Sequence, residues 1–196
     1  MGPDEQRAHP AVPVAEVHQK VREVVAKSLE LKLDDVTLES SLFDLGAESL
    51  DLLDMAFLLE KEYRIQFPRA DILERAAQHF REEDLVVSGV VTPLGLEMLR
   101  RGMPELDPTK FRPGLKAIDV VKMISVGSFA RITVRLLEAK AEAPRDCPKC
   151  GAALVESTVM PELECPSCGE IVPLESGDDI LLRDLTELFK QSQAES

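Results

Sequence analysis

Aromatic side chains and histidines are scarce in this sequence. Aromatic residues make up 4% of the 196 residues, tryptophan is absent, and the three histidines are His9, His18 and His79. The core must therefore be built mainly from Leu, Val, Ile, Ala and Met, and the abundance of Leu and Ala favours helix. No nucleophile is plainly paired with any of the histidines, so the sequence does not indicate an enzyme.

Long apolar segments are also missing. No run approaches the roughly 20 apolar residues that are needed to span a bilayer. Residues 1–16 are polar and contain no apolar segment of the kind found in signal peptides. We therefore expect a cytoplasmic protein with no membrane span.

Positive charge is outweighed by negative charge. The chain has 23 Lys and Arg residues against 36 Asp and Glu residues, which gives a net charge of −13. Phosphates would be repelled, so we expect no general affinity for nucleic acid or for an anionic membrane. Basic protein surfaces are the partners that this charge favours.

Shifts in composition divide the chain into four predicted parts. Residues 1–13 contain three prolines and little apolar material, which is typical of a flexible leader. A helical domain is predicted over 14–140, followed by a cysteine module over 141–175. A short amphipathic helix and tail are predicted over 176–196.

Helical patterns recur through the large domain. Apolar residues at helical spacing predict a helix from Val14 to about Leu29 and a second from Ser49 to Tyr63. Residues 69–80 read as a helix and 84–91 as a short extended piece, and Thr92 and Pro93 are expected to open another helix. The last helix of the domain is expected to begin at a cap formed by Ser125 or Ser128.

The stretch "LGAESLD" places Ser49 at the start of the second helix. One interpretation is an N-cap, in which the serine hydroxyl accepts a hydrogen bond from an unpaired N–H of the first turn. A second interpretation is an attachment point. The unpaired backbone N–H groups and the positive end of the helix dipole would tolerate a phosphodiester attached to Ser49. Gly46 would let the backbone turn tightly before the helix.

The order of these motifs resembles the acyl carrier protein family. "LGAESLD" matches the D-S-L motif of that family, with Glu48 in place of the usual Asp, and "LEKEYRIQFP" and "ISVGSFARI" match the end of its second helix and the start of its last. The resemblance covers about 14–67 and 116–139. It implies a helical bundle whose Ser49 carries a 4′-phosphopantetheine arm.

The resemblance also implies partners. A phosphopantetheinyl transferase would attach the arm, and acyl-transfer, acyl-ligase or synthase enzymes of fatty acid, lipid or secondary-metabolite synthesis would dock through basic patches. The docking face would be the carboxylates around the second helix, although an acidic run is also what a plainly solvated helix face presents. These carboxylates are Glu48, Asp51, Asp54, Glu60 and Glu62.

An insertion over about 69–115 separates the two matching stretches. Small carriers lack such a segment, and extra inserted helices are expected within it. The residues that could line an acyl cavity serve equally well as plain core. They are Leu53, Phe57, Val120, Ile124 and Phe129.

All the cysteines fall in two CxxC pairs with the pattern C-x2-C-x14-C-x2-C. Two intervening residues let one tight turn present both sulfurs to the same ion, and Gly151 and Gly169 after each pair permit a left-handed conformation. The spacing resembles a zinc ribbon, with a β-hairpin closing a site of four thiolates. The predicted ligands of a structural Zn²⁺ are Cys147, Cys150, Cys165 and Cys168.

Two alternatives to zinc are open, a rubredoxin-type iron site and redox-active dithiols. Few basic residues lie near the cysteines, so a protein-contact or folding role fits this module better than nucleic-acid binding. The expected fold is mainly α: an acyl-carrier-like helical bundle with extra inserted helices, a small β zinc ribbon and a C-terminal helix. The expected function is that of an acyl carrier; the alternative is a zinc-ribbon adaptor whose carrier-like bundle is not modified.

Overall fold

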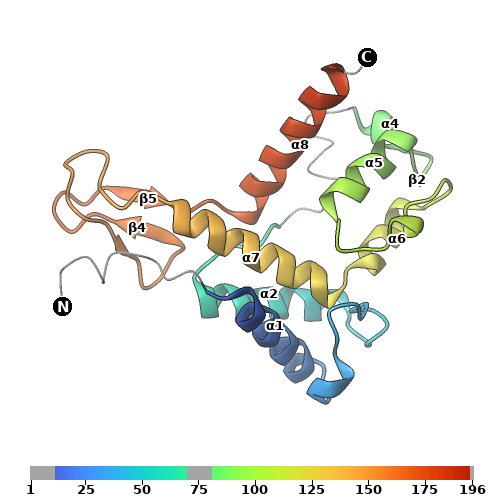
Figure 1. Ribbon diagram of the computed structural model, residues 1–196, viewed down its shortest axis with the longest axis horizontal. Coiled ribbons are helices and arrows are strands. Elements are labelled where there is room, and N and C mark those ends of the chain that lie inside the picture. The colour runs from blue at the N-terminus through green and yellow to red at the C-terminus, as the bar shows by residue number, and fades with distance from the viewer. Residues whose placement is uncertain (1–11, 70–80, 195–196) are drawn as a thin grey trace.

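The fold is known from a computed structural model, which describes residues 12–69 and 81–194 (Figure 1). Its main core lies between α1 (Val14–Ser28), α2 (Ser49–Tyr63) and α7 (Val126–Glu142). These are the helices that the apolar spacing predicts, and α2 has the predicted bounds. Burial of one apolar face of each helix against the others holds the bundle together. The most deeply buried residues of this core are Val17, Val21, Val25, Val36, Leu42, Met55, Leu59, Val126, Ala130 and Leu136.

The long connection between α1 and α2 is anchored to the bundle. It contains a short 3₁₀ helix, η1 (Leu33–Asp35). The N–H of Leu42 donates to the carbonyl of Ile124 at 3.0 Å, and the N–H of Gly127 donates to the carbonyl of Leu38 at 2.7 Å. These bonds fix the connection beside the start of α7, so the backbone that leads into α2 has a defined path.

The insertion forms structure of its own. A short helix, α4 (Glu82–Leu85), leads into a hairpin of β1 (Val86–Val87) and β2 (Val90–Val91), and α5 (Pro93–Gly102) follows. The Thr92 side chain accepts from the N–H of Gly95 at 3.1 Å, which confirms the predicted start of α5. The helix predicted over 69–80 lies outside the described residues.

A second apolar core joins the insertion to the segment before α7. Beyond α5, the chain forms η2 (Pro108–Lys110), α6 (Ala117–Val120) and η3 (Val121–Met123). The buried members of the second core are Val91, Leu96, Leu99, Met103, Leu106, Phe111 and Val120.

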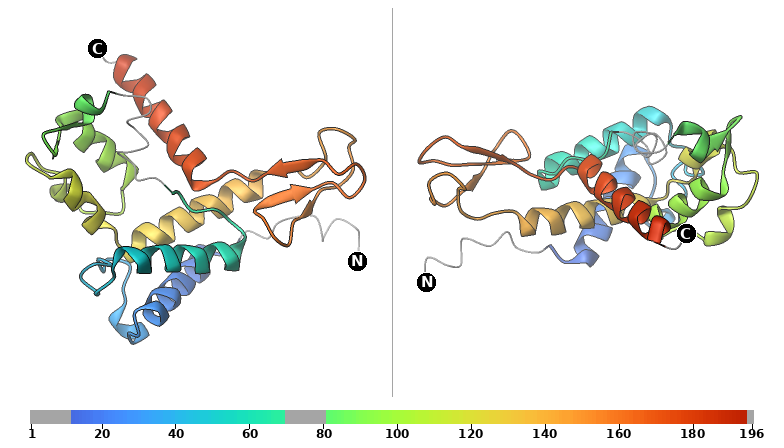
Figure 2. Two further views of the ribbon diagram at one scale, coloured as in Figure 1. Left: turned by 180° about the vertical axis from the view of Figure 1, so that it is seen from behind. Right: turned by 90° about the horizontal axis from the view of Figure 1, so that it is seen from above.

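The cysteine module is a small antiparallel sheet. It pairs β3 (Val155–Glu156) with β4 (Glu162–Glu164), as expected for a hairpin, and adds β5 (Ile171–Pro173) on the other side of β4. Figure 1 shows this sheet and the insertion at opposite ends of α7, and Figure 2 agrees from behind and from above.

The last helix, α8 (Gly177–Ala194), packs against the bundle at its first turns. The N–H of Gly177 donates to the carbonyl of Gln66 at 2.7 Å. A Cβ at Gly177 would lie 2.3 Å from Cδ of Pro68, so this close approach requires glycine. Ile180, one turn later, is buried in the main core.

The expected fold class is confirmed: a mainly helical protein with small sheets and a cysteine cluster compatible with a zinc ribbon. Over 12–69 and 81–194, no helix combines the length and the apolar character that crossing a membrane demands.

Candidate functional site

Ser49 is the first residue of α2, at the end of a tight turn. Gly46 has a φ of +96°, in the left-handed region, as the sequence predicts. Its N–H donates to the carbonyl of Phe43 at 3.0 Å, and the N–H of Ala47 donates to the carbonyl of Leu42 at 2.9 Å. The turn delivers the chain to the mouth of the helix with Ser49 on the surface.

The interpretation of Ser49 as the N-cap is wrong. Glu48 occupies the cap position with extended backbone angles, and the Asp51 carboxylate accepts from the N–H of Glu48 at 2.7 Å. Asp51, in the first turn, therefore caps the start of the helix, and the Ser49 hydroxyl takes no part in the cap.

The Ser49 hydroxyl is consequently available. Within residues 12–69 and 81–194, it forms no hydrogen bond to another group. It lies beside the first-turn N–H groups of a 15-residue helix, where the helix dipole favours an anion. An exposed, unengaged hydroxyl at a helix N-terminus fits the phosphodiester of a phosphopantetheine arm.

A cavity of about 410 Å³ opens beside Ser49. Its lining is mostly apolar and comes from α2, the segment after α2, the insertion, the α6–η3 segment, α7 and α8. Four of the five residues considered as lining or core from the sequence lie on it: Leu53, Val120, Ile124 and Phe129. The fifth, Phe57, is 55% exposed and has the guanidinium of Arg69 4.9 Å above its ring.

Charged residues of the cavity wall are paired within the chain. Glu105 of the insertion accepts from Nε of Arg131 at 2.6 Å and from the Ser128 hydroxyl at 2.6 Å. Arg131 also donates to the carbonyl of Gly102. These bonds connect the insertion to α7 directly beside the cavity. The Glu105–Arg131 bond is the strong one, because both groups are charged and partly buried.

Glu105 offers a test of that connection. Glu105→Ala would leave the partly buried Arg131 without its carboxylate, and we expect a loss of about 2 kcal/mol in the free energy of unfolding, measured by urea denaturation. The control is Asp119→Asn, which removes one partner of the exposed Asp119–Lys122 pair and should leave the transition almost unchanged. An equal effect of both substitutions would contradict a structural role for Glu105.

The five carboxylates predicted to form a docking face differ in their surroundings. Asp54 is exposed, and Glu48 is exposed at the cap. Asp51 accepts the capping hydrogen bond, and Glu62 pairs with Lys20 at 2.8 Å. These four carboxylates therefore do not have equal freedom to meet a partner.

Glu60 departs from the predicted role. It accepts from the N–H of Phe67 at 2.7 Å and from the guanidinium of Arg69 at 2.9 Å, and its side chain is 13% exposed. Glu60 therefore holds the segment after α2 against the helix instead of presenting a free carboxylate to solvent.

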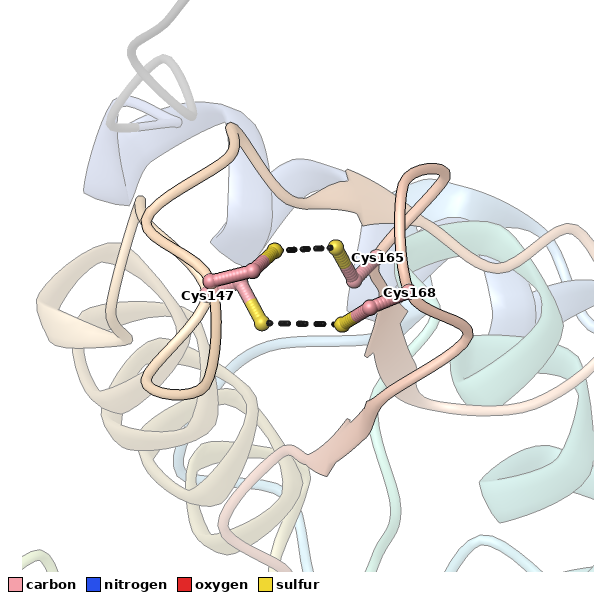
Figure 3. Close-up of side chains that lie close together, drawn as sticks. Cys147, Cys165 and Cys168 are labelled. Atoms are coloured by element: carbon pink, nitrogen blue, oxygen red, sulfur yellow. Dashed lines mark hydrogen bonds between the residues drawn. The ribbon is translucent and has the colours of Figure 1, made fainter.

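The four cysteines converge as the spacing predicts. All four sulfurs lie within 4.8 Å of one another; Cys147 and Cys168 are 3.6 Å apart, and Cys150 and Cys165 are 3.5 Å apart (Figure 3). Each knuckle closes in the same way. The N–H of Gly151 donates to the carbonyl of Cys147, and that of Gly169 donates to Cys165, both at 2.9 Å.

The cluster already favours a thiolate. Burial opposes ionisation of the Cys165 thiol, but hydrogen bonds from the backbone of Cys168 and Ser167 and from neighbouring thiols lower its pKa to about 6. A backbone hydrogen bond from Glu170 lowers the pKa of Cys168, but burial and hydrogen bonds with the other three sulfurs outweigh it and raise that pKa to about 12, as expected when several sulfurs share protons. Four convergent sulfurs on two turns fit a tetrahedral soft metal ion such as Zn²⁺ and leave no open position for a substrate.

The cysteine module is joined to the bundle through Glu156 of β3. Its carboxylate contacts Nζ of Lys140 near the end of α7 and lies 3.3 Å from the guanidinium of Arg64, directly after α2. Lys140 also donates to the carbonyl of Tyr63 at 2.9 Å. One acidic side chain thereby connects the module to two bundle helices.

The structure describes one of the three histidines. His18 lies on α1 beside a separate hollow formed with α7 and Pro104. His9 and His79 lie outside the described residues. Sequence reasoning missed Glu105, Arg131 and Leu181 as cavity residues, because no local pattern relates the insertion or the last helix to α2.

Comparison with known proteins gives a match over the first part of the chain. The family model described as "Phosphopantetheine attachment site" matches residues 19–77. The chain is similar to the acyl carrier proteins of three Clostridium perfringens strains, SM101, ATCC 13124 and 13. Each is 38% identical over 53 residues, which cover 26% of this chain and 70% of the relative. No solved structure matches.

Proposed function

Because this chain belongs to the acyl carrier protein family, we propose that it holds acyl groups as a thioester on a 4′-phosphopantetheine arm attached to Ser49. Carriers of this family are non-catalytic, and the chain is accordingly not an enzyme. The observation that carries the assignment to Ser49 is its exposed, unengaged hydroxyl at the start of α2, beside an apolar cavity.

The arm would supply a terminal thiol that carries the acyl group. The chain's own residues do the rest. The α2 N-terminus favours the phosphate charge, the Gly46 turn exposes the hydroxyl, and the cavity beside Ser49 keeps an apolar group from water.

The proposed partners are a phosphopantetheinyl transferase and the acyl-transfer, acyl-ligase or synthase enzymes of fatty acid, lipid or secondary-metabolite synthesis. Exposed apolar residues beside Ser49 support a docking role for α2: Leu50 is 76% exposed and Leu53 is 49% exposed. Asp54 adds negative charge on the same helix, and the chain's net charge of −13 favours basic patches on a partner. Glu60 is left out of the proposed face because it is paired within the chain.

For the cysteine module we propose a structural Zn²⁺ held by Cys147, Cys150, Cys165 and Cys168. The convergence of four sulfurs supports it. We further propose that the chain is organised as a carrier-like domain over 14–140, a zinc ribbon over 141–175 and a C-terminal helix from 176, as the sequence predicts.

Intact-protein mass spectrometry tests the carrier function. The full-length protein is incubated with coenzyme A and a broad-specificity phosphopantetheinyl transferase, and its mass should rise by one phosphopantetheine group. The alternative function, an adaptor whose carrier-like bundle is not modified, predicts an unchanged mass. An unchanged mass, with a known carrier modified in the same reaction, would therefore overturn the proposal.

The docking face gives a second expected result. Asp54→Lys reverses an exposed charge near Ser49 and should slow modification by the transferase by about threefold to tenfold at low salt, with a smaller effect as salt rises. The measurement is the initial rate of mass conversion. Glu164→Lys, the same change on β4 of the cysteine module, is the matched control. Equal slowing by both variants would indicate an effect of net charge instead of a docking face.

A further inference from the structure

The cavity beside Ser49 is lined partly by segments that lie outside the matched residues 19–77. Leu181 of α8 and Met103 at the end of α5 contribute to its lining, together with residues of α2 and α7. We infer that α8 and the insertion form the outer wall of the acyl cavity, and that Leu181 and Met103 limit the size of the aliphatic acyl group that it accepts. This inference rests on the proposed carrier function.

α8 is held firmly enough to act as a wall. At its start, Gly177 is pressed against Pro68 and bonded to Gln66. Two turns later, the Asp184 carboxylate receives two hydrogen bonds from the guanidinium of Arg135 on α7, at 2.5 and 2.7 Å. A bidentate pair of this kind fixes orientation as well as distance. Leu181 lies between these two attachments.

The chemistry of the wall selects an aliphatic group. The lining includes Arg69, Glu105 and Arg131, and each has a partner in the chain: Arg69 pairs with Glu60 at 2.9 Å, and Arg131 pairs with Glu105 at 2.6 Å. A charged acyl group entering the cavity would lose its hydration without gaining a counterion, which is costly. An unbranched hydrocarbon chain would bury apolar surface with no such loss.

The experiment loads the full chain with a graded series of straight-chain acyl groups, from acetyl to dodecanoyl, by transferase reaction with the corresponding acyl-coenzyme A. Mass spectrometry first verifies loading, and cleavage of the thioester by hydroxylamine is then timed. Each methylene that the cavity buries should slow cleavage by up to about fourfold, the factor that corresponds to about 0.8 kcal/mol per buried CH₂. Protection should level off once the cavity is full.

Substitutions at Leu181 should change the acyl-chain length at which protection levels off. With Leu181→Trp, protection levels off at a shorter chain, and with Leu181→Ala it extends to a longer one. Leu182→Ala, at a neighbouring position of α8 that is not part of the lining, is the matched control and should match the unsubstituted protein. A profile unchanged by both Leu181 variants would overturn the inference.

Asp184→Asn tests the wall without altering the lining. It weakens the attachment to Arg135, and we expect the thioester of the longest protected chain to be cleaved about fivefold faster while the acetyl thioester is unaffected. Equal rates with and without the substitution would show that α8 does not close the cavity. Failure of loading would instead contradict the carrier function, so the two failures are distinguishable.

Discussion

Ser49→Ala leaves the chain without a phosphopantetheine arm when it is incubated with coenzyme A and a phosphopantetheinyl transferase. The expected effect is all-or-none, because the proposed attachment atom is the Ser49 hydroxyl oxygen and alanine has no equivalent. The fold should persist, since the cap at the start of α2 is formed by Glu48 and Asp51 without the Ser49 hydroxyl. Intact mass measures the modification, and circular dichroism measures the helix content.

The control for this substitution is another serine of the same connection. The Ser40 hydroxyl accepts from the N–H of Thr37 at 3.1 Å, away from the start of α2. Ser40→Ala should gain the arm at the rate of the unsubstituted protein. If Ser49→Ala still gains the mass of one arm, Ser49 is not the attachment site, and another hydroxyl must be sought by peptide mapping.

Cys165→Ser is expected to abolish metal binding and unfold the cysteine module. Cys165 is 3% exposed, and it belongs to a module whose strands are only two or three residues long. So small a sheet cannot support itself by packing, and in small zinc domains metal binding supplies on the order of 10 kcal/mol of folding free energy. We expect about one zinc per chain in the unsubstituted protein and almost none in the variant, measured by elemental analysis.

Ser167→Ala is the matched control for this loss. Ser167 lies in the same knuckle, and its backbone, not its hydroxyl, assists Cys165. The control should retain the metal and the amide protection of β3 to β5 in hydrogen exchange. A coloured iron protein would contradict zinc, and a metal-free chain with disulfide-linked cysteines would favour the redox alternative.

Removal of the metal should leave the carrier function in place. The main core contains residues of α1, α2, α7 and Ile180 of α8, and none from the cysteine module. A chelator should therefore release β3 to β5 while Ser49 is still modified. Loss of modification on chelation would contradict this expectation. It would show that the helical bundle depends on the contact of Glu156 with Lys140 and Arg64.

Local pattern was sufficient for the helices and for the cysteine site. α2 extends over Ser49–Tyr63 as predicted because a continuous amphipathic run is bounded by a glycine turn on one side and a segment ending in Pro68 on the other. The four cysteines converge because the spacing within each CxxC pair is set by one turn of backbone. In both cases the determining residues are close neighbours in the chain.

The start of α2 shows where local pattern falls short. The sequence offers Ser49 as the cap, but Glu48 occupies that position, and the Asp51 carboxylate accepts a hydrogen bond from the N–H of Glu48. Glu60 is a similar case. Its spacing places it with the other carboxylates of α2, but the return of the chain brings Phe67 and Arg69 against it.

The sequence by itself determined the carrier family, the candidate attachment serine and the four candidate metal ligands, because each depends on a short motif whose chemistry is local. Only the tertiary structure decided what surrounds Ser49. Glu105 meets Arg131 across 26 positions of sequence, and Asp184 meets Arg135 across 49. Such pairs follow from how whole elements pack, and residue periodicity within a single element carries no information about them. The apolar cavity beside Ser49 and its wall from α8 are consequences of that packing.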